Sequence, residues 1–218
     1  MERTGLPDHG SPEEYSPRLA ARSVMRLAES MLDRKRFEHC VGAARTAAAI
    51  CRRFGHDEDA AYLAGLAHDL CKRLPPAEQF SLARSFAGPL PEVVFENLRL
   101  PHGPAAAVYL EREGLSSDPA VLEAVAYHTV GKAGMGPVAL AVYIADKIEP
   151  SRRDWAQGVR ELLSAGAFDG SGGLGRLATA TLETMLDEIS ASGRAVAATT
   201  LVLYNSLTGK SVSEWPVR

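Results

Sequence analysis

The sequence predicts an all-α protein built as one helical bundle. Apolar residues recur at helical spacing, strand-like alternation is nearly absent, and clusters of Gly, Pro and Ser separate the helical stretches. The 218 residues are 46% hydrophobic, which is enough for one domain with a substantial core. We expect this domain over residues 16–209, between a flexible N-terminal tail at 1–15 and a C-terminal tail at 210–218.

The first three helices are predicted from apolar periodicity and from residues that end a helix. Residues 24–32 carry an apolar stripe at positions i, i+3, i+4, i+7 and i+8. A second helix is expected over 36–54 and ends at Gly55, because glycine is common just beyond a helix C-terminus. A third helix begins after Asp57 and is expected to continue until Pro75, since proline cannot extend a helix.

The later helices are bounded by prolines and glycines in the same way. Glycine-rich segments at 131–137 and 170–173 interrupt the helical pattern. We expect the further helices over residues 76–86, 91–99, 102–113, 118–128, 137–148, 174–190 and 199–207.

Composition excludes several classes of protein. The formal charge of −3 argues against binding along a nucleic-acid backbone, which requires a basic surface. The N-terminal residues lack the pattern of a signal peptide, and the clearest apolar run, 138–145, is too short to cross a bilayer. Three cysteines without CxxC spacing indicate a reducing compartment. We therefore expect a soluble cytoplasmic protein.

Four histidines and two aspartates stand out because their neighbours are apolar. Asp69 follows His68 directly in LAGLAHDL, and Asp146 lies in VALAVYIADKI. A carboxylate on a buried helix face must be neutralised, hydrogen-bonded or bound to a cation, because burying an isolated charge is costly. The other histidines of this kind occur on separate predicted helices, and they are His39, His102 and His128.

Each of these residues alone has an ordinary structural explanation. A single buried histidine is more often a hydrogen-bonded core residue than a metal ligand. Asp69 could pair with Lys72, and Asp146 could pair with Lys147 or Arg152. The complete set favours a metal site, because an adjacent His-Asp pair occurs together with three more histidines and one more aspartate on separate inward-facing segments. The two carboxylates would balance only part of the charge of two divalent ions, and a bridging hydroxide and substrate phosphates would balance the rest. Mixed imidazole and carboxylate donors suit iron, manganese, cobalt or zinc better than magnesium or calcium.

The order H…HD…H…H…D resembles the ligand pattern of HD-domain phosphohydrolases. Within them, the chain closely resembles the bacterial YqeK-like family, described as symmetrical diadenosine tetraphosphate hydrolases that favour iron. The resemblance covers residues 17–165 and is carried by RFEHCVGAARTA, LAGLAHDLCKRLP, LPHGPAAAVYL and YHTVGKAGMGPVALAVYIADKIEPSR. It implies the HD-domain helical bundle as the fold.

The resemblance also implies roles for individual residues. The ligands of a first metal would be His39, His68, Asp69 and Asp146, and those of a second would be His102 and His128, with Asp69 bridging the two. Asp69 and Lys72 are the expected catalytic residues. Lys132, Lys147 and Arg152 flank the ligand-bearing segments, so with Lys72 they are candidates for phosphate contact, although solvated surface charge would also explain them.

The activity implied is symmetrical cleavage of diadenosine tetraphosphate to two ADP by a metal-activated water. Two divalent ions are the expected cofactors, with iron favoured. A nucleotide is the expected partner, with no nucleic acid and no membrane, and a homodimer is an open alternative. The competing hypotheses are an HD-type nucleotidase or pyrophosphatase acting on another nucleotide, and a non-catalytic nucleotide-binding signalling domain.

Two departures from the family pattern affect substrate preference more than metal binding. Position 73, often acidic in relatives, is Arg73 here. Residues 193–205 read GRAVAATTLVLYN, where relatives have a glycine followed by a His-Pro-Asp-Thr-like run. A cyclic-dinucleotide phosphodiesterase is disfavoured, because His128 is followed by Thr-Val-Gly-Lys and not by a Gly-Tyr-Pro element.

Overall fold

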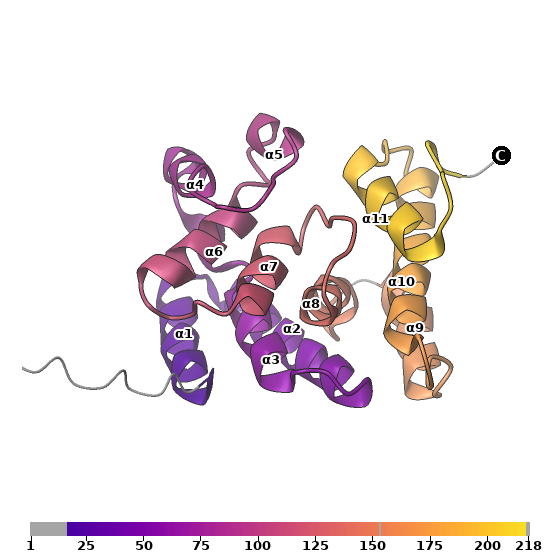
Figure 1. The fold of residues 1–218 in the computed structure, drawn as a ribbon, viewed down its shortest axis with the longest axis horizontal. Coiled ribbons are helices and arrows are strands. Elements are labelled where there is room, and N and C mark those ends of the chain that lie inside the picture. The colour runs from indigo at the N-terminus through magenta and orange to yellow at the C-terminus, as the bar shows by residue number, and fades with distance from the viewer. Residues whose placement is uncertain (1–16, 153, 217–218) are drawn as a thin grey trace, which may run out of the picture.

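A computed structural model of the protein describes residues 17–152 and 154–216. These residues form helices joined by turns and loops, which confirms the all-α prediction (Figure 1). None of the described helices is long and apolar enough to cross a membrane. The predicted N-terminal tail lies outside the described residues.

The helices follow one another in the order that the sequence pattern predicts, with some changes of boundary. They are α1 (Pro17–Met31), α2 (Arg34–Arg53), α3 (Glu58–Ala67), η1 (Leu70–Arg73), α4 (Pro76–Ala83), α5 (Val93–Glu96), α6 (His102–Arg112), α7 (Pro119–Tyr127), α8 (Pro137–Ile148), η2 (Asp154–Ala156), α9 (Gln157–Ser164), α10 (Gly173–Ala191) and α11 (Ala198–Thr208).

Aspartate side chains cap several of these helices. Asp33, Asp57 and Asp118 precede α2, α3 and α7, and each carboxylate accepts a hydrogen bond from a backbone N–H in the first turn. Such caps satisfy backbone donors that have no partner within the helix. They fix where α2, α3 and α7 begin, and histidines of the candidate site lie on α2 and just beyond the ends of α3 and α7.

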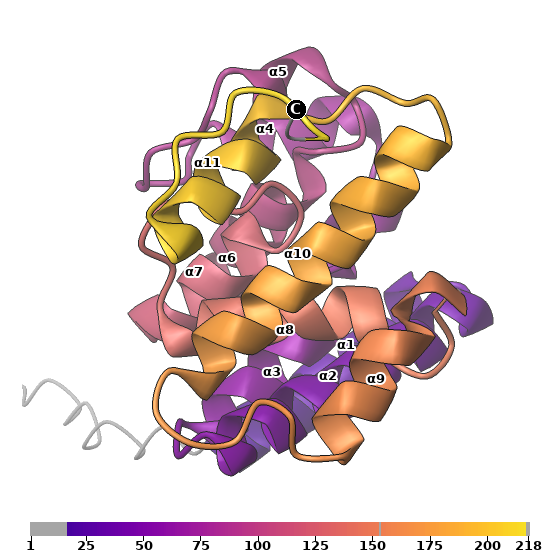
Figure 2. The same cartoon turned by 90° about the vertical axis from the view of Figure 1, so that its right-hand side faces the viewer.

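Helix α8 lies at the centre of the molecule. Its residues Ala141, Val142 and Ile144 are fully buried. Helices α2, α3 and α7 pack against one side of α8, and α10 crosses the other side (Figures 1 and 2). An acidic residue on this helix, Asp146, therefore lies between two layers of the bundle.

Small residues let α2 and α3 approach each other closely. A Cβ atom added at Gly65 in α3 would lie 2.5 Å from the Cα of Ala44 in α2. No side chain fits between the two backbones at this point. This contact fixes the position of the end of α3 relative to α2.

The structure corrects the third predicted helix. The α-helix ends at Ala67, and the chain turns at His68 and Asp69 before the short 3-10 helix η1. The backbone N–H of Lys72 donates to the carbonyl of Asp69 at 2.9 Å, which is the tighter hydrogen-bonding pattern of a 3-10 turn. The predicted helix over 91–99 is also shortened to the single turn α5, and η2 and α9 were not predicted.

The C-terminal residues that the structure describes lie against α10 and α11. Asn205 pairs with the backbone N–H and carbonyl of Val212 at 2.8 and 2.9 Å. The Trp215 ring stacks edge-on against Tyr204, and its indole N–H donates to Asp187.

Candidate metal centre

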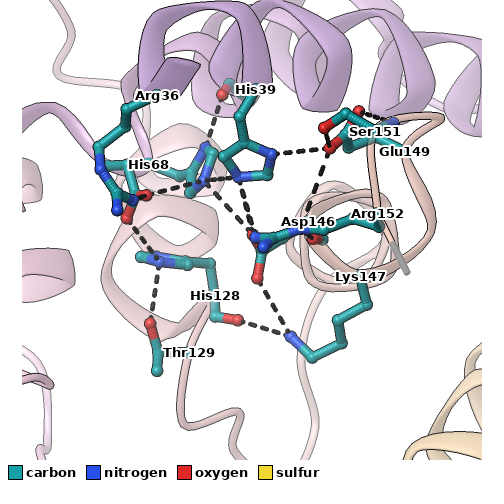
Figure 3. Close-up of polar contacts among 12 residues, drawn as sticks. Arg36, His39, His68, His128, Thr129, Asp146, Lys147, Glu149, Ser151 and Arg152 are labelled. Atoms are coloured by element: carbon teal, nitrogen blue, oxygen red, sulfur yellow. Dashed lines mark hydrogen bonds and ion pairs between the residues drawn. The ribbon is translucent and has the colours of Figure 1, made fainter. Parts of the chain in front are cut away.

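The structure brings all six predicted ligand residues to one place in the interior. They come from α2 (His39), the turn after α3 (His68 and Asp69), the start of α6 (His102), the end of α7 (His128) and α8 (Asp146). Every one is buried except Asp146, whose side chain is 16% exposed. Figure 3 shows the His39, His68, His128 and Asp146 side chains pointing toward one another.

Three of the six form a first cluster of donor atoms. The Nε2 of His39 lies 3.1 Å from the Nε2 of His68 and 3.1 Å from Oδ1 of Asp146. The distance from His68 Nε2 to Asp146 Oδ1 is 3.6 Å. Atoms this close to one another could all bind a single metal ion.

A second cluster lies beside the first and is formed by His102, His128 and Asp69. The Nε2 atoms of His102 and His128 are 3.1 Å apart, and they lie 3.1 and 3.7 Å from Oδ1 of Asp69. The other oxygen of that carboxylate, Oδ2, lies 3.8 Å from Nε2 of His68 in the first cluster. Asp69 thus turns one oxygen toward each cluster, as a bridging carboxylate does.

Outward hydrogen bonds to backbone carbonyls orient three of the four imidazole rings. The Nδ1 atoms of His68, His102 and His128 lie 2.7 to 2.8 Å from backbone carbonyls of Gly65, Arg99 and Val125. A carbonyl only accepts, so each of these Nδ1 atoms carries the hydrogen and each Nε2 presents a lone pair to the centre.

The donor set fits divalent cations. In each cluster the Nε2 atoms of two histidines lie 3.1 Å apart with their lone pairs facing. No hydrogen lies between them, so they cannot hydrogen-bond to each other, but both can bind a cation. Burial, and then the neighbouring histidines, hold the pKa of His128 well below its usual range, and burial also lowers the pKa of His102. His102 and His128 are therefore neutral imidazoles whose lone pairs lie beside the Asp69 carboxylate, and such groups are typical transition-metal ligands.

Comparison with known protein families bears on this centre directly. The model of the HD domain family matches residues 36–151, a span that contains all six residues. The chain belongs to the HD domain family.

Curated relatives are more specific. The HD chain is 33% identical over 129 residues to a Bacillus subtilis protein named symmetrical bis(5'-nucleosyl)-tetraphosphatase. The aligned segment is 59% of this chain and 69% of the relative. The HD chain is also 32% identical over 135 residues to a Mycoplasma pneumoniae protein named probable nicotinate-nucleotide adenylyltransferase/Ap4A hydrolase, covering 61% of this chain and 38% of the relative.

A solved structure shares the fold of this HD chain. It is a Clostridium acetobutylicum protein described as a predicted HD superfamily hydrolase involved in NAD metabolism, with a TM-score of 0.73 and 24% identity. The match covers 86% of this chain and 96% of the other. The shared fold therefore extends beyond the segment that the family model matches.

Sequence reasoning missed Glu149, a buried carboxylate of the HD centre. Its Oε1 lies 3.0 Å from Nδ1 of His39, and its Oε2 accepts from the backbone N–H of Ser151 at 2.9 Å (Figure 3). A Cβ atom at Gly42 would lie 2.6 Å from Oε2, so the glycine leaves room for the carboxylate. The signal available in the sequence was its spacing, three residues after Asp146.

Arg36 was also missed, although it lies one helical turn before His39 on α2. Its Nη1 forms a close ion pair with Oδ2 of Asp69. Its buried Nε has no hydrogen-bond partner within the described part of the chain. Arg36 therefore brings a positive charge to the carboxylate oxygen that faces the first cluster.

Three of the four candidate phosphate contacts touch the centre. Lys72 Nζ lies 2.9 Å from Nε2 of His102, and Nη2 of Arg152 lies 2.6 Å from Oδ1 of Asp146. Lys147 Nζ lies 3.6 Å from the other oxygen of Asp146. These cations balance the carboxylates of the site.

Lys132 lies differently from the other candidates. Its Nζ pairs with Glu123 at 2.7 Å and lies 5.3 Å from the centre of the Tyr127 ring. Among the described contacts, none joins Lys132 to the six clustered residues.

The charge of the Asp69 carboxylate depends on the groups around it. Burial alone would raise the pKa of Asp69, but its hydrogen-bonding and charged neighbours, among them the Lys72 ammonium, hold it well below its usual range. Asp69 is therefore ionised at neutral pH and able to act as a ligand.

Proposed function

We propose that the chain is a two-metal phosphohydrolase that cleaves dinucleoside polyphosphates, with diadenosine tetraphosphate cut symmetrically to two ADP. The observation that carries this proposal is Asp69, whose two oxygens face two separate clusters of imidazole nitrogens. Paired metal sites of this kind stabilise both the attacking and the leaving oxygen in phosphoryl transfer. The names of the bis(5'-nucleosyl)-tetraphosphatase relatives supply the substrate class.

In this proposal His39, His68, Asp69 and Asp146 hold the first ion, and His102 and His128 hold the second together with Asp69. Bound divalent ions would supply a water of lowered pKa and would polarise the phosphoryl oxygens. The neutral imidazoles and ionised carboxylates of the chain keep the centre positively charged when both ions are present. An anionic polyphosphate is the substrate that such a charge attracts.

The side-chain cations stabilise charge that builds up on the non-bridging oxygens during attack. Lys72 does this at the second cluster and Arg152 at the first. Lys72 lies within hydrogen-bonding distance of Nε2 of His102, and Arg152 lies within that distance of Nε2 of His39. The leaving group of symmetrical cleavage is the terminal phosphate of ADP, whose low pKa removes the need for a strong general acid. Asp69 and Lys72 are thus the residues we assign to catalysis.

Iron is the metal that we propose. Four imidazoles with two carboxylates form a donor set suited to iron, manganese, cobalt or zinc, and they disfavour magnesium and calcium. Metal analysis after anaerobic purification tests this point. We expect two transition-metal ions per chain, with iron giving the highest turnover on reconstitution, and fewer than one ion per chain would contradict a two-metal centre.

The substrate is tested by comparing turnover of diadenosine tetraphosphate, simple NTPs and dNTPs by the iron-loaded protein. We expect diadenosine tetraphosphate to give the highest kcat/KM and to yield ADP as its only nucleotide product. Formation of ATP and AMP would contradict symmetrical cleavage. Faster turnover of NTPs would instead make the protein an HD-type nucleotidase.

We further propose that the protein works in the cytoplasm on a free nucleotide, and a homodimer is the assembly to be tested. The three cysteines support a reducing compartment, because Cys40, Cys51 and Cys71 are all buried as free thiols. Size-exclusion chromatography with light scattering tests the assembly, and a monomer at micromolar concentration would contradict it.

A further inference from the structure

A pocket of about 320 Å³ opens beside the metal centre, on the side covered by α10. It lies between the C-terminal end of α8, the short helix η2 and the last turns of α10, which crosses α8 in Figure 2. Its lining carries three cations, two carboxylates and an apolar wall, and the residues are Asp146, Lys147, Arg152, Trp155, Met185, Glu188, Ile189 and Arg194. Its volume is at the lower end of the range found for small-molecule sites.

Arg152 connects this pocket to the centre. The guanidinium lines the pocket, and its Nη2 also lies 3.1 Å from Nε2 of His39 and 2.6 Å from Oδ1 of Asp146 (Figure 3). A chain of phosphates that leaves the centre on this side would pass the guanidinium directly. The pocket is therefore continuous with the place where we expect the reaction to occur.

Arg194 offers a second positive charge farther from the centre. Arg194 is exposed, and its Nε donates a hydrogen bond to the hydroxyl of Ser192 at 2.7 Å. No other hydrogen bond or ion pair of this guanidinium occurs among the described residues. Its terminal nitrogens can therefore bind a phosphate group in the paired geometry that arginine favours.

Trp155 gives the pocket a flat aromatic wall. The indole is partly buried against the core, and Met185 on α10 lies in the same wall. Within the described part of the chain, the Trp155 ring stacks on no other aromatic ring. Nucleobases stack on such rings because both faces are π-surfaces, and methionine adapts its shape to the edge of a bound ring.

We infer that this pocket is the subsite for one nucleoside diphosphate half of the substrate. Arg152 and Arg194 bind its phosphates, and Trp155 stacks on its base. The inference rests on the proposed function, since it assigns a place to half of a dinucleoside tetraphosphate. It also assigns base recognition to a tryptophan that lies outside the six clustered residues.

The sequence allows a direct optical test, because Trp155 and Trp215 are its two tryptophans. Trp215 does not line the pocket, so Trp215→Phe leaves Trp155 as the only indole and keeps an aromatic ring against Tyr204. We expect ADP to quench the emission of metal-loaded Trp215→Phe in a saturable way, with adenosine binding more weakly. Absence of quenching by ADP would overturn the inference.

The phosphate contact is tested by adding Arg194→Gln to that background. We expect the Kd for ADP to rise at least about tenfold, because charge-assisted hydrogen bonds to phosphate are lost, while the Kd for adenosine stays unchanged. The matched control is Arg22→Gln, which removes an exposed arginine from α1. Equal Kd values for ADP in the two variants would overturn the assignment of Arg194.

Steady-state kinetics separate this inference from the proposed function. We expect Trp155→Ala to raise KM for diadenosine tetraphosphate and Trp155→Phe to restore it, with circular dichroism confirming that both variants fold. Unchanged KM in Trp155→Ala alongside normal turnover would overturn the subsite and leave the function standing. Quenching by ADP without hydrolysis of the tetraphosphate would overturn the function and leave a nucleoside diphosphate site.

Discussion

Asp69 is the residue on which both donor clusters depend. Oδ1 faces His102 and His128 and Oδ2 faces His68, so removal of this carboxylate affects both clusters at once. Asp69→Ala should abolish turnover and leave less than one metal ion per chain, measured by metal analysis of the purified variant. Retention of two ions with full activity would mean that the ligand set is wrongly assigned.

Glu149 acts on the centre through another residue. Its carboxylate accepts from His39 Nδ1 and so holds the ring with Nε2 toward the first cluster. Glu149→Ala should weaken metal binding about 10–100-fold, measured by competition with a chromogenic chelator. Glu149→Gln keeps an acceptor oxygen and should lose less, and Glu161→Ala, which removes an exposed carboxylate from α9, should have no effect.

The six clustered residues were predictable because each is polar on an otherwise apolar segment. Glu149 and Arg36 carried no such signal, since glutamate and arginine are common at helix ends and on helix surfaces. Their roles depend on contacts with residues far along the chain, such as the pairing of Glu149 with His39 at a separation of 110 residues. Only the packed structure brings those residues together.

At the scale of elements, the close packing of α2 and α3 positions two of the six clustered residues, His39 and His68. Gly65→Ala would place a Cβ 2.5 Å from Ala44 Cα and should lower the free energy of unfolding by about 1–3 kcal/mol. Gly158→Ala in α9 is the matched control, because its Cβ would have no neighbour within 4 Å. It should stabilise the helix by about 0.5–1 kcal/mol. Urea unfolding measures both, and equal effects would refute close packing as the cause.

The last turn of α8 contains a buried lysine, Lys147, whose titration should make the free energy of unfolding depend on pH. Burial lowers the pKa of Lys147 to about 8, although Asp146 opposes the shift. The unfolded chain keeps this proton until about pH 10.4. Between these values the unfolded state binds more protons, so the contribution of Lys147 to the unfolding free energy rises with pH, by at most about 1.4 kcal/mol per pH unit.

Lys147→Met should remove that rise. The comparison uses metal-free protein, with urea midpoints measured from pH 7 to pH 10 for the natural chain and the variant. The difference in unfolding free energy between the two should grow with pH in favour of the natural chain. A constant difference would show that Lys147 keeps its proton throughout this range.

Helix boundaries were predictable where a local signal sets them, as Pro137 does for α8. They were wrong where tertiary structure sets them. The sequence pattern continues through His68 and Asp69, but the helix ends at Ala67 and the backbone tightens into η1. This turn lets the adjacent imidazole and carboxylate both face the centre, which neighbouring positions of a regular helix would not allow.

At the scale of the whole molecule, the centre joins segments that are distant in the chain. Its residues extend from His39 to Asp146 and come from α2, α6 and α8 and from the turns just after α3 and α7. An ion bound to these groups is released when the bundle unfolds, because the unfolded chain does not keep the donors together. Metal binding should therefore stabilise the fold as one unit.

Removal of the metal should consequently lower the melting temperature in a single transition. An ion present at 100 times its Kd adds about 2.7 kcal/mol to the free energy of unfolding. For a chain of this size that corresponds to a shift of about 5–11 °C. Differential scanning calorimetry before and after chelation measures the shift, and Asp69→Ala is the control because the chelator should barely affect it. Two separate transitions in the metal-free protein would show that the part of the bundle around α10 folds independently of the centre, since α10 contributes none of the six residues.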